Sequence, residues 1–582
     1  MVRILINQVG YISGDRKRVI VESDGEKVDS FTIIRDRDNK EVYKGDLVYY
    51  GRVERWNKGE YLVGDFSSFS TPGSYKVKVG NEIERIEISE YLVSLRLISA
   101  NTAFFKAQRS SGEWDSEDRH LSFSGPRKGE MDLRGGWFDA SGDHGIHLSH
   151  LSHSTWYNPQ QMGLSTYFFF KGYDYVEKKK SPSYTILKKR MLDEGSWGAD
   201  FLVRTHIPSG SFIRSIRRNE DLDHMDVIKG TRSIGFDYHN SSDQFSEAET
   251  KDSEIVDDTY YETSLRSGGA LAIAALASAS THETISEDYS SQDYLEAAEE
   301  AYEYLVKNNN LYTNDGKWNF VDYYTVLLAS TELYLSTKDE KYLLDSRAWC
   351  RKMIEHTLAI REGERRFEYT PGFPFHHASD EGLPILSLVF YGEVEKDDSL
   401  LKEAFRVAEE VMRHKVSISK ERVNPFNYPV EEVLDNGCVK TQFFFPHNTT
   451  VSPWWQGENA RLASLSAASY LVYTHTEDEN LKNDLEEMST FTLDWIMGQN
   501  PFDSSMIEGF GRNNPEYFFF NNYDYVNIPG GIVNGITSMI DDEEGIDLVM
   551  EPRSDVSDNW RWAEQWIPHV SWFMFAKCIR KE

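Results

Sequence analysis

A glycine-rich segment of the chain holds two aspartates four residues apart, Asp139 and Asp143. Its sequence is Gly135-Gly-Trp-Phe-Asp139-Ala-Ser-Gly-Asp143-His-Gly. Glycine lets the backbone turn tightly, so the pattern favours a loop over a helix, and Trp137 offers a flat apolar face for a sugar ring. Paired carboxylates near a bound water, with a third acid across the scissile bond, are what an inverting glycosidase needs. Taken alone, the loop also fits a turn or a cation site.

A second polar group is Pro374-Phe-His-His-Ala-Ser-Asp380-Glu381. Asp380 or Glu381 could pair with a substrate ammonium, although Ser379-Asp380 before an apolar run also fits a helix cap. His376 and His377 are adjacent and lack the spacing of a helical metal pair. The sequence therefore calls for no metal and no cofactor here.

A third group is Pro453-Trp-Trp-Gln-Gly-Glu458-Asn-Ala-Arg461. Trp454 and Trp455 could line a sugar subsite or belong to the core, since tryptophan serves both purposes. Glu458, next to them, is a further candidate for a substrate contact.

The elements that must position these residues fall into two parts. Up to residue 88, β-branched and aromatic residues alternate or cluster between turn signals, at residues 18–22, 30–35, 44–50 and 75–79, which predicts a β-sandwich. No exposed aromatic row is evident there between Ser30 and Tyr75. From residue 89 to 582, helical spacing recurs at residues 187–205, 260–280, 294–306, 321–336, 400–414, 460–473 and 481–497. Long aromatic loops between helices favour a large α-barrel with its binding face on the loops.

Charge and composition exclude several functions. The 582 residues carry a formal net charge of −32, with 63 Lys plus Arg against 95 Asp plus Glu. Such a surface repels phosphate backbones and anionic lipids, so we expect neither a nucleic-acid nor a membrane partner. Three separated cysteines indicate no disulfide framework, and the opening residues fit neither a signal peptide nor a membrane span, so we expect a cytoplasmic protein.

Several landmarks occur in order along the chain: Asn7-Gln-Val-Gly-Tyr11, Gly136-Trp-Phe-Asp139 with Asp143, His447-Asn-Thr, Pro453-Trp-Trp-Gln-Gly-Glu-Asn-Ala-Arg461, and Asp558-Asn-Trp-Arg-Trp-Ala-Glu564. Together they resemble glycoside hydrolase family 9, in its members with an N-terminal immunoglobulin-like module before an (α/α)6 barrel. The similarity spans nearly the whole chain. It implies a multidomain protein, with the Ig-like β-sandwich at residues 1–88 and an all-α barrel at residues 89–582.

The resemblance also implies roles for three carboxyl groups. The two loop aspartates would hold and deprotonate the attacking water, Asp143 as the base and Asp139 as the residue that orients the water. Glu564 would be the general acid, and Trp560, Trp562 and Trp566 would give it apolar surroundings that raise the pKa of a carboxyl. Some members of the family bind structural calcium or zinc.

Two departures from the family's cellulases concern the cleavage site. Those enzymes usually have Asp-Ala-Gly-Asp, and this chain has Asp139-Ala-Ser-Gly-Asp143, one residue longer. They also have a Pro-His-His-Arg-like motif that contacts the sugar, where this chain has Phe510-Gly-Arg-Asn-Asn-Pro515-Glu-Tyr-Phe-Phe-Phe520. The cleavage site is therefore expected to be rebuilt.

The resemblance is closest to the intracellular exo-β-D-glucosaminidase branch from marine chitin-using bacteria, which carries the lengthened loop. We therefore expect an inverting hydrolase that removes β-1,4-linked glucosamine from short glucosamine or chitosan oligosaccharides, without an obligate protein partner. The alternative is an inverting β-glucosidase, cellodextrinase or endoglucanase on β-1,4-glucans. A sugar-binding protein on a hydrolase scaffold is a third hypothesis, which the presence of all three carboxylates disfavours.

Overall fold

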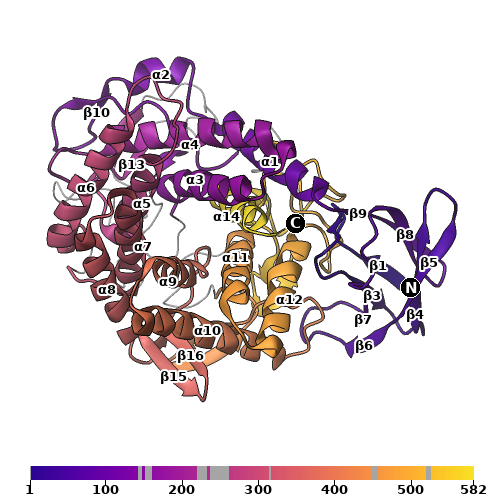
Figure 1. The fold of residues 1–582 in the computed structure, drawn as a ribbon. Helices are drawn as coiled ribbons and strands as arrows, with labels where there is room; N and C mark the ends of the chain where they lie inside the picture. Colours follow the sequence, from indigo (N-terminus) through magenta and orange to yellow (C-terminus); the bar gives the residue numbers. More distant parts are fainter. Residues whose placement is uncertain are drawn as a thin grey trace.

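The computed structural model describes residues 2–141, 147–150, 160–218, 232–235, 261–313, 316–446, 456–518 and 526–581. Strands occupy the chain up to Ser89, and the first long helix begins at Leu92. The predicted order, an N-terminal β-sandwich followed by a helical domain, is confirmed (Figure 1). Within the described residues, no helix is both long and apolar enough to cross a membrane.

Two sheets face each other in the N-terminal module, in the orders β1-β3-β7-β6 and β2-β9-β8-β4-β5. Val19 and Val21 of the first sheet and Ile33 and Val77 of the second belong to the same buried cluster, as expected where two sheets pack face to face. The strands are β1 (Val2–Leu5), β2 (Tyr11–Ile12), β3 (Arg18–Ser23), β4 (Ser30–Arg35), β5 (Lys40–Asp46), β6 (Val48–Gly51), β7 (Glu60–Asp65), β8 (Gly73–Val79) and β9 (Glu82–Ser89).

The single strand predicted at residues 44–50 is wrong, because the chain changes sheet there. β5 pairs with β4 as far as Asp46, whereas Val48 pairs with Val63 of β7 in the other sheet. Leu47, between them, is buried, and its N–H donates to the Asp29 carbonyl at 2.9 Å. The buried leucine thus marks a corner at which one strand ends and an edge strand begins.

The helical domain is built from two concentric rings, and in the described structure each inner helix contacts the next around a closed circle (Figure 1). Because the chain alternates between the rings, all inner helices begin at the same end of the barrel. The inner helices are α3 (Met162–Lys178), α5 (Ala270–Ala279), α7 (Phe320–Thr337), α9 (Leu383–Val394), α11 (Asn459–His475) and α14 (Ile567–Cys578). The outer helices are α1 (Leu92–Gln108), α4 (Thr185–Thr205), α6 (Ser291–Asn308), α8 (Glu340–Glu355), α10 (Asp398–Lys420) and α12 (Glu479–Ile496).

The inner helices are more deeply buried than the outer ones. Every residue of α5 and α14 is buried, as expected for helices that are covered on all sides, whereas α10 buries only one stripe. The helix predicted for residues 260–280 starts later than expected: an irregular turn at Leu265–Gly269 precedes α5, with Gly268 at a φ of 116°. Residue 260 lies outside the described residues.

Shorter elements lie between the long helices. They are the helices α2 (Glu113–Asp118) and α13 (Trp560–Ala563), and the strands β10 (Leu121–Ser122), β11 (Glu130–Met131), β12 (His147–His150), β13 (Ser215–Arg218), β14 (Arg232–Gly235), β15 (Thr357–Arg361), β16 (Glu364–Thr370), β17 (Phe373–Pro374), β18 (Glu431–Asp435), β19 (Cys438–Gln442), β20 (Thr537–Met539) and β21 (Asp542–Asp547). These small sheets are antiparallel and pair within the loops that join the two rings.

The module is docked rigidly against the end of α12. Arg18 donates to the Phe426 carbonyl at 2.9 Å, and Asn7 donates to the Asp494 carboxylate at 2.7 Å. Trp56 lies among four aromatic rings of the helical domain, those of Phe426, Phe443, Phe444 and Trp495. The two domains therefore share one continuous core.

We expect Trp56→Ala to lower the free energy of unfolding by about 3–5 kcal/mol, because it leaves a cavity among those four rings. Ile83→Ala, at an exposed position of β9, is the matched control and should change little. Urea denaturation of both variants measures the difference. Equal midpoints for the two would contradict the shared core.

Candidate active site

The candidate acid and one candidate aspartate lie on two paired stretches of backbone. The Ser141 N–H donates to the Gln565 carbonyl, and the Ile567 N–H donates to the Asp139 carbonyl, both at 2.9 Å. Ala140 and Trp566 form the antiparallel bridge between them. Facing Cα atoms in such a pair lie about 4.5–5.5 Å apart. The fold thus joins the glycine-rich loop to the segment that carries Glu564.

Glu564 is positioned by a network of main-chain hydrogen bonds. It directly follows α13, and its carbonyl accepts from the Asn534 N–H at 2.8 Å. Asn534 also donates through its side chain to the Trp560 carbonyl at 2.8 Å. The neighbouring Gly535 N–H donates to the Trp562 carbonyl at 2.7 Å. Both sides of α13 are therefore held by the segment around Asn534.

His569 of α14 connects this network to α11. Its Nδ1 accepts from the Ala460 N–H at 2.7 Å, and its Nε2 donates to the Asn534 side-chain oxygen at 2.7 Å. Burial lowers the pKa of His569 to about 3, so the ring is neutral and can accept at one nitrogen while it donates at the other. No motif in the sequence singled out this histidine.

Trp137 belongs to the core, so the predicted sugar contact is wrong for this residue. Its side chain has 0% exposure and packs edge-on against Phe105 and at a tilt against Phe169. The indole N–H donates to Glu194 at 3.2 Å. A Cβ at Gly198 would lie 2.5 Å from the indole, so α4 approaches closely only because this position is glycine. Trp137 anchors the glycine-rich loop.

Asp139 is buried. Hydrogen bonds to the residues just before it determine where the loop turns. The Phe138 N–H donates to the Gln108 carbonyl at 2.8 Å, and Trp197 donates to the Gly136 carbonyl at 2.8 Å. Gly136 has a φ of 70°, which a glycine adopts without strain. Asp143, Trp454 and Trp455 lie outside the described residues.

Asp380 joins three inner helices at the end of the barrel where they begin. Its carboxylate accepts from Trp572 Nε1 of α14 at 2.7 Å and from the backbone N–H of Gln160, just before α3, at 3.0 Å. Asp380 itself precedes α9, whose N-cap is Gly382. The carboxyl is 1% exposed, so we correct both expectations for it: it neither caps the helix nor faces a ligand. Burial raises its pKa to about 7.

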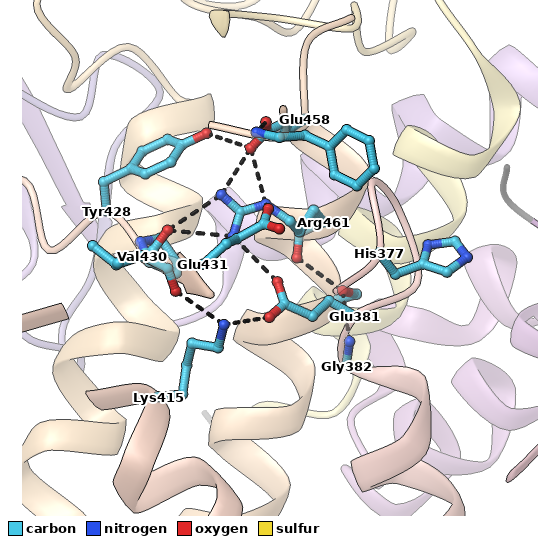
Figure 2. Close-up of polar contacts among 12 residues, drawn as sticks. His377, Glu381, Gly382, Lys415, Tyr428, Val430, Glu431, Glu458 and Arg461 are labelled. Carbon is cyan, nitrogen blue, oxygen red and sulfur yellow. Dashed lines mark hydrogen bonds and ion pairs between the residues drawn. The ribbon is translucent and has the colours of Figure 1, made fainter. Parts of the chain in front are cut away.

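Glu458 is part of a buried ionic cluster, defined here as Glu381, Lys415, Glu431, Glu458 and Arg461 (Figure 2). Glu458 accepts from the Arg461 guanidinium at 2.7 Å and from the Tyr428 hydroxyl at 2.9 Å, and the Phe445 N–H also donates to it. It is 1% exposed, so the predicted substrate contact is corrected to a structural one.

The rest of the ionic cluster holds the loops around α11. Arg461 donates to the Phe443 carbonyl at 3.0 Å and pairs with Glu381 at 3.2 Å. Lys415 pairs with Glu381 and donates to the Val430 carbonyl at 2.9 Å (Figure 2). The cluster therefore fixes both described ends of the segment between Pro446 and Gln456, in which the sequence placed Trp454 and Trp455.

The charges of the ionic cluster balance if one of its three glutamates is protonated. Burial raises the pKa of Glu381, but Lys415 and Arg461 more than offset this and hold it below its usual range. Burial raises the pKa of Glu431 well above its usual range, although it lies 2.8 Å from Arg461. A proton on Glu431 would leave two cations facing two carboxylates, with no uncompensated buried charge.

No three His, Cys, Asp or Glu side chains in the described ranges are arranged to hold a metal ion. Cys350 and Cys578 are buried, and Cys438 is exposed.

Because burial raises the pKa of Glu431 well above its usual range, we expect Glu431→Gln to lower the free energy of unfolding by less than about 1 kcal/mol. Glu458→Gln is the variant for comparison. It should lower the free energy of unfolding by about 3–5 kcal/mol, because it removes a carboxylate that compensates the charge of Arg461. Urea denaturation at pH 7 compares the two. Equal losses would show that Glu431 is ionised.

The raised pKa of Asp380 gives its stability contribution a definite pH dependence. The folded protein binds this proton more tightly than the unfolded chain, whose value is 3.8, so the contribution is present below pH 3.8 and is lost as the pH rises through about 7. As the pH rises from 5 to 8, the free energy of unfolding of Asp380→Asn should therefore increase relative to that of the wild type. A difference that stays constant over this range would contradict a protonated Asp380.

His569 should behave in the opposite sense. Its pKa of about 3 lies below the ordinary 6.5, so its contribution is present above pH 6.5 and is lost as the pH falls toward 3. Thermal unfolding of His569→Gln should consequently depend less on pH between 4 and 6.5 than that of the wild type. An unchanged slope would sink the neutral-histidine assignment.

Comparison with known proteins agrees with this architecture. Residues 96–536 match the family model of glycosyl hydrolase family 9, and residues 2–84 match that of the cellulase N-terminal Ig-like domain. A curated relative, a xyloglucan-specific endo-β-1,4-glucanase of Bacteroides ovatus, is 24% identical over 376 residues. That alignment spans 58% of this chain and 58% of the relative's length.

Solved structures show the same fold over nearly the whole chain. A Bacteroides ovatus GH9 structure has a TM-score of 0.66 at 18% identity and covers 99% of this chain and 98% of its own. A metagenome-derived family 9 endoglucanase gives 0.65 at 17% identity, with the same coverage. A single mutant of a thermostable endoglucanase from Alicyclobacillus acidocaldarius gives 0.64 at 16%, also covering 99% and 98%. Because the family model covers most of its length, this chain belongs to glycosyl hydrolase family 9.

Proposed function

We propose that this protein is an inverting glycoside hydrolase that removes β-1,4-linked glucosamine from short glucosamine oligosaccharides. The main observation behind the proposal is the backbone pairing of residues 139–141 with residues 565–567, which begins one residue after Glu564 and includes Asp139. Family membership supports the class of reaction. The cytoplasmic location expected from the sequence stays a prediction.

In the proposed reaction, the Glu564 carboxyl donates its proton to the glycosidic oxygen as the bond from that oxygen to the anomeric carbon breaks. A water attacks the anomeric carbon from the opposite face, and Asp143 takes the proton that this water loses. Asp139 orients the water. The product sugar has the inverted anomeric configuration, and inverting enzymes separate the acid and the base by about 6.5–9.5 Å to leave room for the water.

The preference for glucosamine rests on how the cleavage site departs from that of cellulases. Arg512 lies in the stretch where the resemblance places a sugar-contacting arginine, but here it binds Asp503 at 2.9 Å and Glu84 of the module at 2.8 Å. Asn514 donates to three main-chain carbonyls, those of Ser505, Ile507 and Phe510. These side chains tie the loop to its surroundings, which supports a rebuilt sugar site.

Charge also favours an amino sugar. A net charge of −32 attracts a protonated amine and gives no such advantage to a neutral glucan. The lengthened loop Asp139-Ala-Ser-Gly-Asp143 provides the local difference from the family's cellulases.

Hydrolysis of a β-1,4-glucan is the second candidate. The observation in its favour is that the relatives named above are a xyloglucan-specific endo-β-1,4-glucanase and endoglucanases. The same three carboxyl groups would perform that reaction, so the two candidates differ in the sugar that is bound and not in the chemistry.

We expect Glu564→Gln to reduce the turnover of glucosamine disaccharide by about 10²–10⁴-fold, because the amide cannot donate the proton that the leaving oxygen needs. Glu551→Gln, at an exposed glutamate of the same segment, is the control and should keep wild-type turnover. Proton NMR of the first product should show the α-anomer. Full activity of Glu564→Gln, or a β-anomer as first product, would refute the assigned mechanism.

A further inference from the structure

The module carries an exposed aromatic strand at its edge. Tyr49 is 62% exposed and Tyr50 is 46% exposed, and both belong to β6, the last strand of the four-stranded sheet. Their hydroxyls make no hydrogen bond with any described residue. The sequence showed no exposed aromatic row between Ser30 and Tyr75, and these two adjacent tyrosines form a pair and not a row. Both are exposed because β6 is an edge strand.

These two tyrosines line a groove between the module and the outer helices α10 and α12. The groove has a volume of about 560 Å³, within the roughly 300–1,000 Å³ typical of small-molecule sites. Asn427, Asp484 and Glu487 line its opposite wall. The module lies beside α12 (Figure 1). The lining residues come from both domains, so each domain contributes one wall of the groove.

The cations and carboxylates of this wall differ in how far they are already paired. Lys420 pairs with Asp484, and Arg422 pairs with Glu544 at 2.8 Å. Glu487 makes no ion pair in the described structure, and it accepts one hydrogen bond, from Asn427 Nδ2 at 3.3 Å. Arg16 and Arg18 of the module interact electrostatically with Glu487 without forming an ion pair with it. The groove thus combines exposed aromatic rings with a carboxylate and an amide.

We propose that this groove is a second saccharide-binding site, which holds a β-1,4-linked glucosamine oligosaccharide on the outside of the barrel. A tyrosine ring offers a flat apolar face for a sugar ring, and the carboxylate suits hydroxyl or ammonium donors. The sugar class rests on the proposed function, whereas the groove itself does not. The shared core of module and barrel keeps its two walls in register, so the site is preformed.

The test is calorimetric titration of a glucosamine hexamer into the full chain carrying Glu564→Gln, which prevents turnover. We expect two binding events, one of which weakens at least tenfold when Tyr49→Ala and Tyr50→Ala are added, as truncation of central aromatic contacts does. Ile83→Ala, an exposed apolar position of the same module outside the groove, is the control and should keep both events. With Glu564 intact, the tyrosine variant should cleave glucosamine disaccharide at the wild-type rate.

A charge variant identifies the sugar class. Glu487→Gln keeps an acceptor for Asn427 but loses the negative charge, so it should weaken the second event for the glucosamine hexamer and leave binding of its N-acetylated counterpart unchanged. Equal effects on both sugars would overturn the amine assignment.

Other outcomes separate this inference from the proposed function. A single binding event, or two events that the tyrosine variant does not affect, overturns the second site even if the wild type releases glucosamine. Tyrosine-dependent binding without any glucosamine release supports the groove and contradicts the proposed function. A dimer in sedimentation velocity that dissociates in the tyrosine variant would assign β6 to contacts between copies and overturn the saccharide site.

Discussion

The antiparallel pairing of residues 139–141 with residues 565–567 is the constraint on which the candidate site depends. It joins a loop near the start of the helical domain to the segment that enters its last inner helix. The second of these segments leads into α14, which closes the inner ring by contacting α3. Assembly of the acid and the aspartate is therefore coupled to folding of the whole domain.

Buried polar contacts at the same end of the barrel maintain this arrangement. Asp380 connects the starts of α3 and α9 to Trp572 of α14, and His569 connects α11 to the segment around Asn534. The ionic cluster around Arg461 holds Phe443 and Phe445 beside α11. Such groups are costly to leave unpaired, so together they favour one arrangement of the loops.

The sequence predicted helices of both rings but did not predict all of them. The outer helices α4, α6, α10 and α12 were expected because their apolar stripes recur every three to four residues. The inner helices α7 and α11 were also expected, although both are buried nearly all round. The inner helices α3 and α14 and the outer helices α1 and α8 were not among the predicted ranges. The sequence around Leu47 also has no turn signal, so the change from one sheet to the other at this residue was not predicted.

The sequence could name the catalytic candidates from residue type and spacing. It could not predict which side chains surround them. The spacing of Asp139 and Asp143 and the resemblance of the Glu564 segment are features of the chain itself. Whether Trp137 faces a sugar or the core depends on Gly198 of α4, and whether Glu458 is free depends on Arg461 and Tyr428. Burial that is set by distant partners cannot be inferred from local sequence.

The most direct measurement is monosaccharide release from three disaccharides incubated separately with the purified protein: the β-1,4-linked disaccharide of glucosamine, its N-acetylated form chitobiose, and cellobiose. The account predicts release from the glucosamine disaccharide and none from the other two. Preferential cleavage of cellobiose would contradict it, and would assign the rebuilt loop to a glucan in place of an amino sugar.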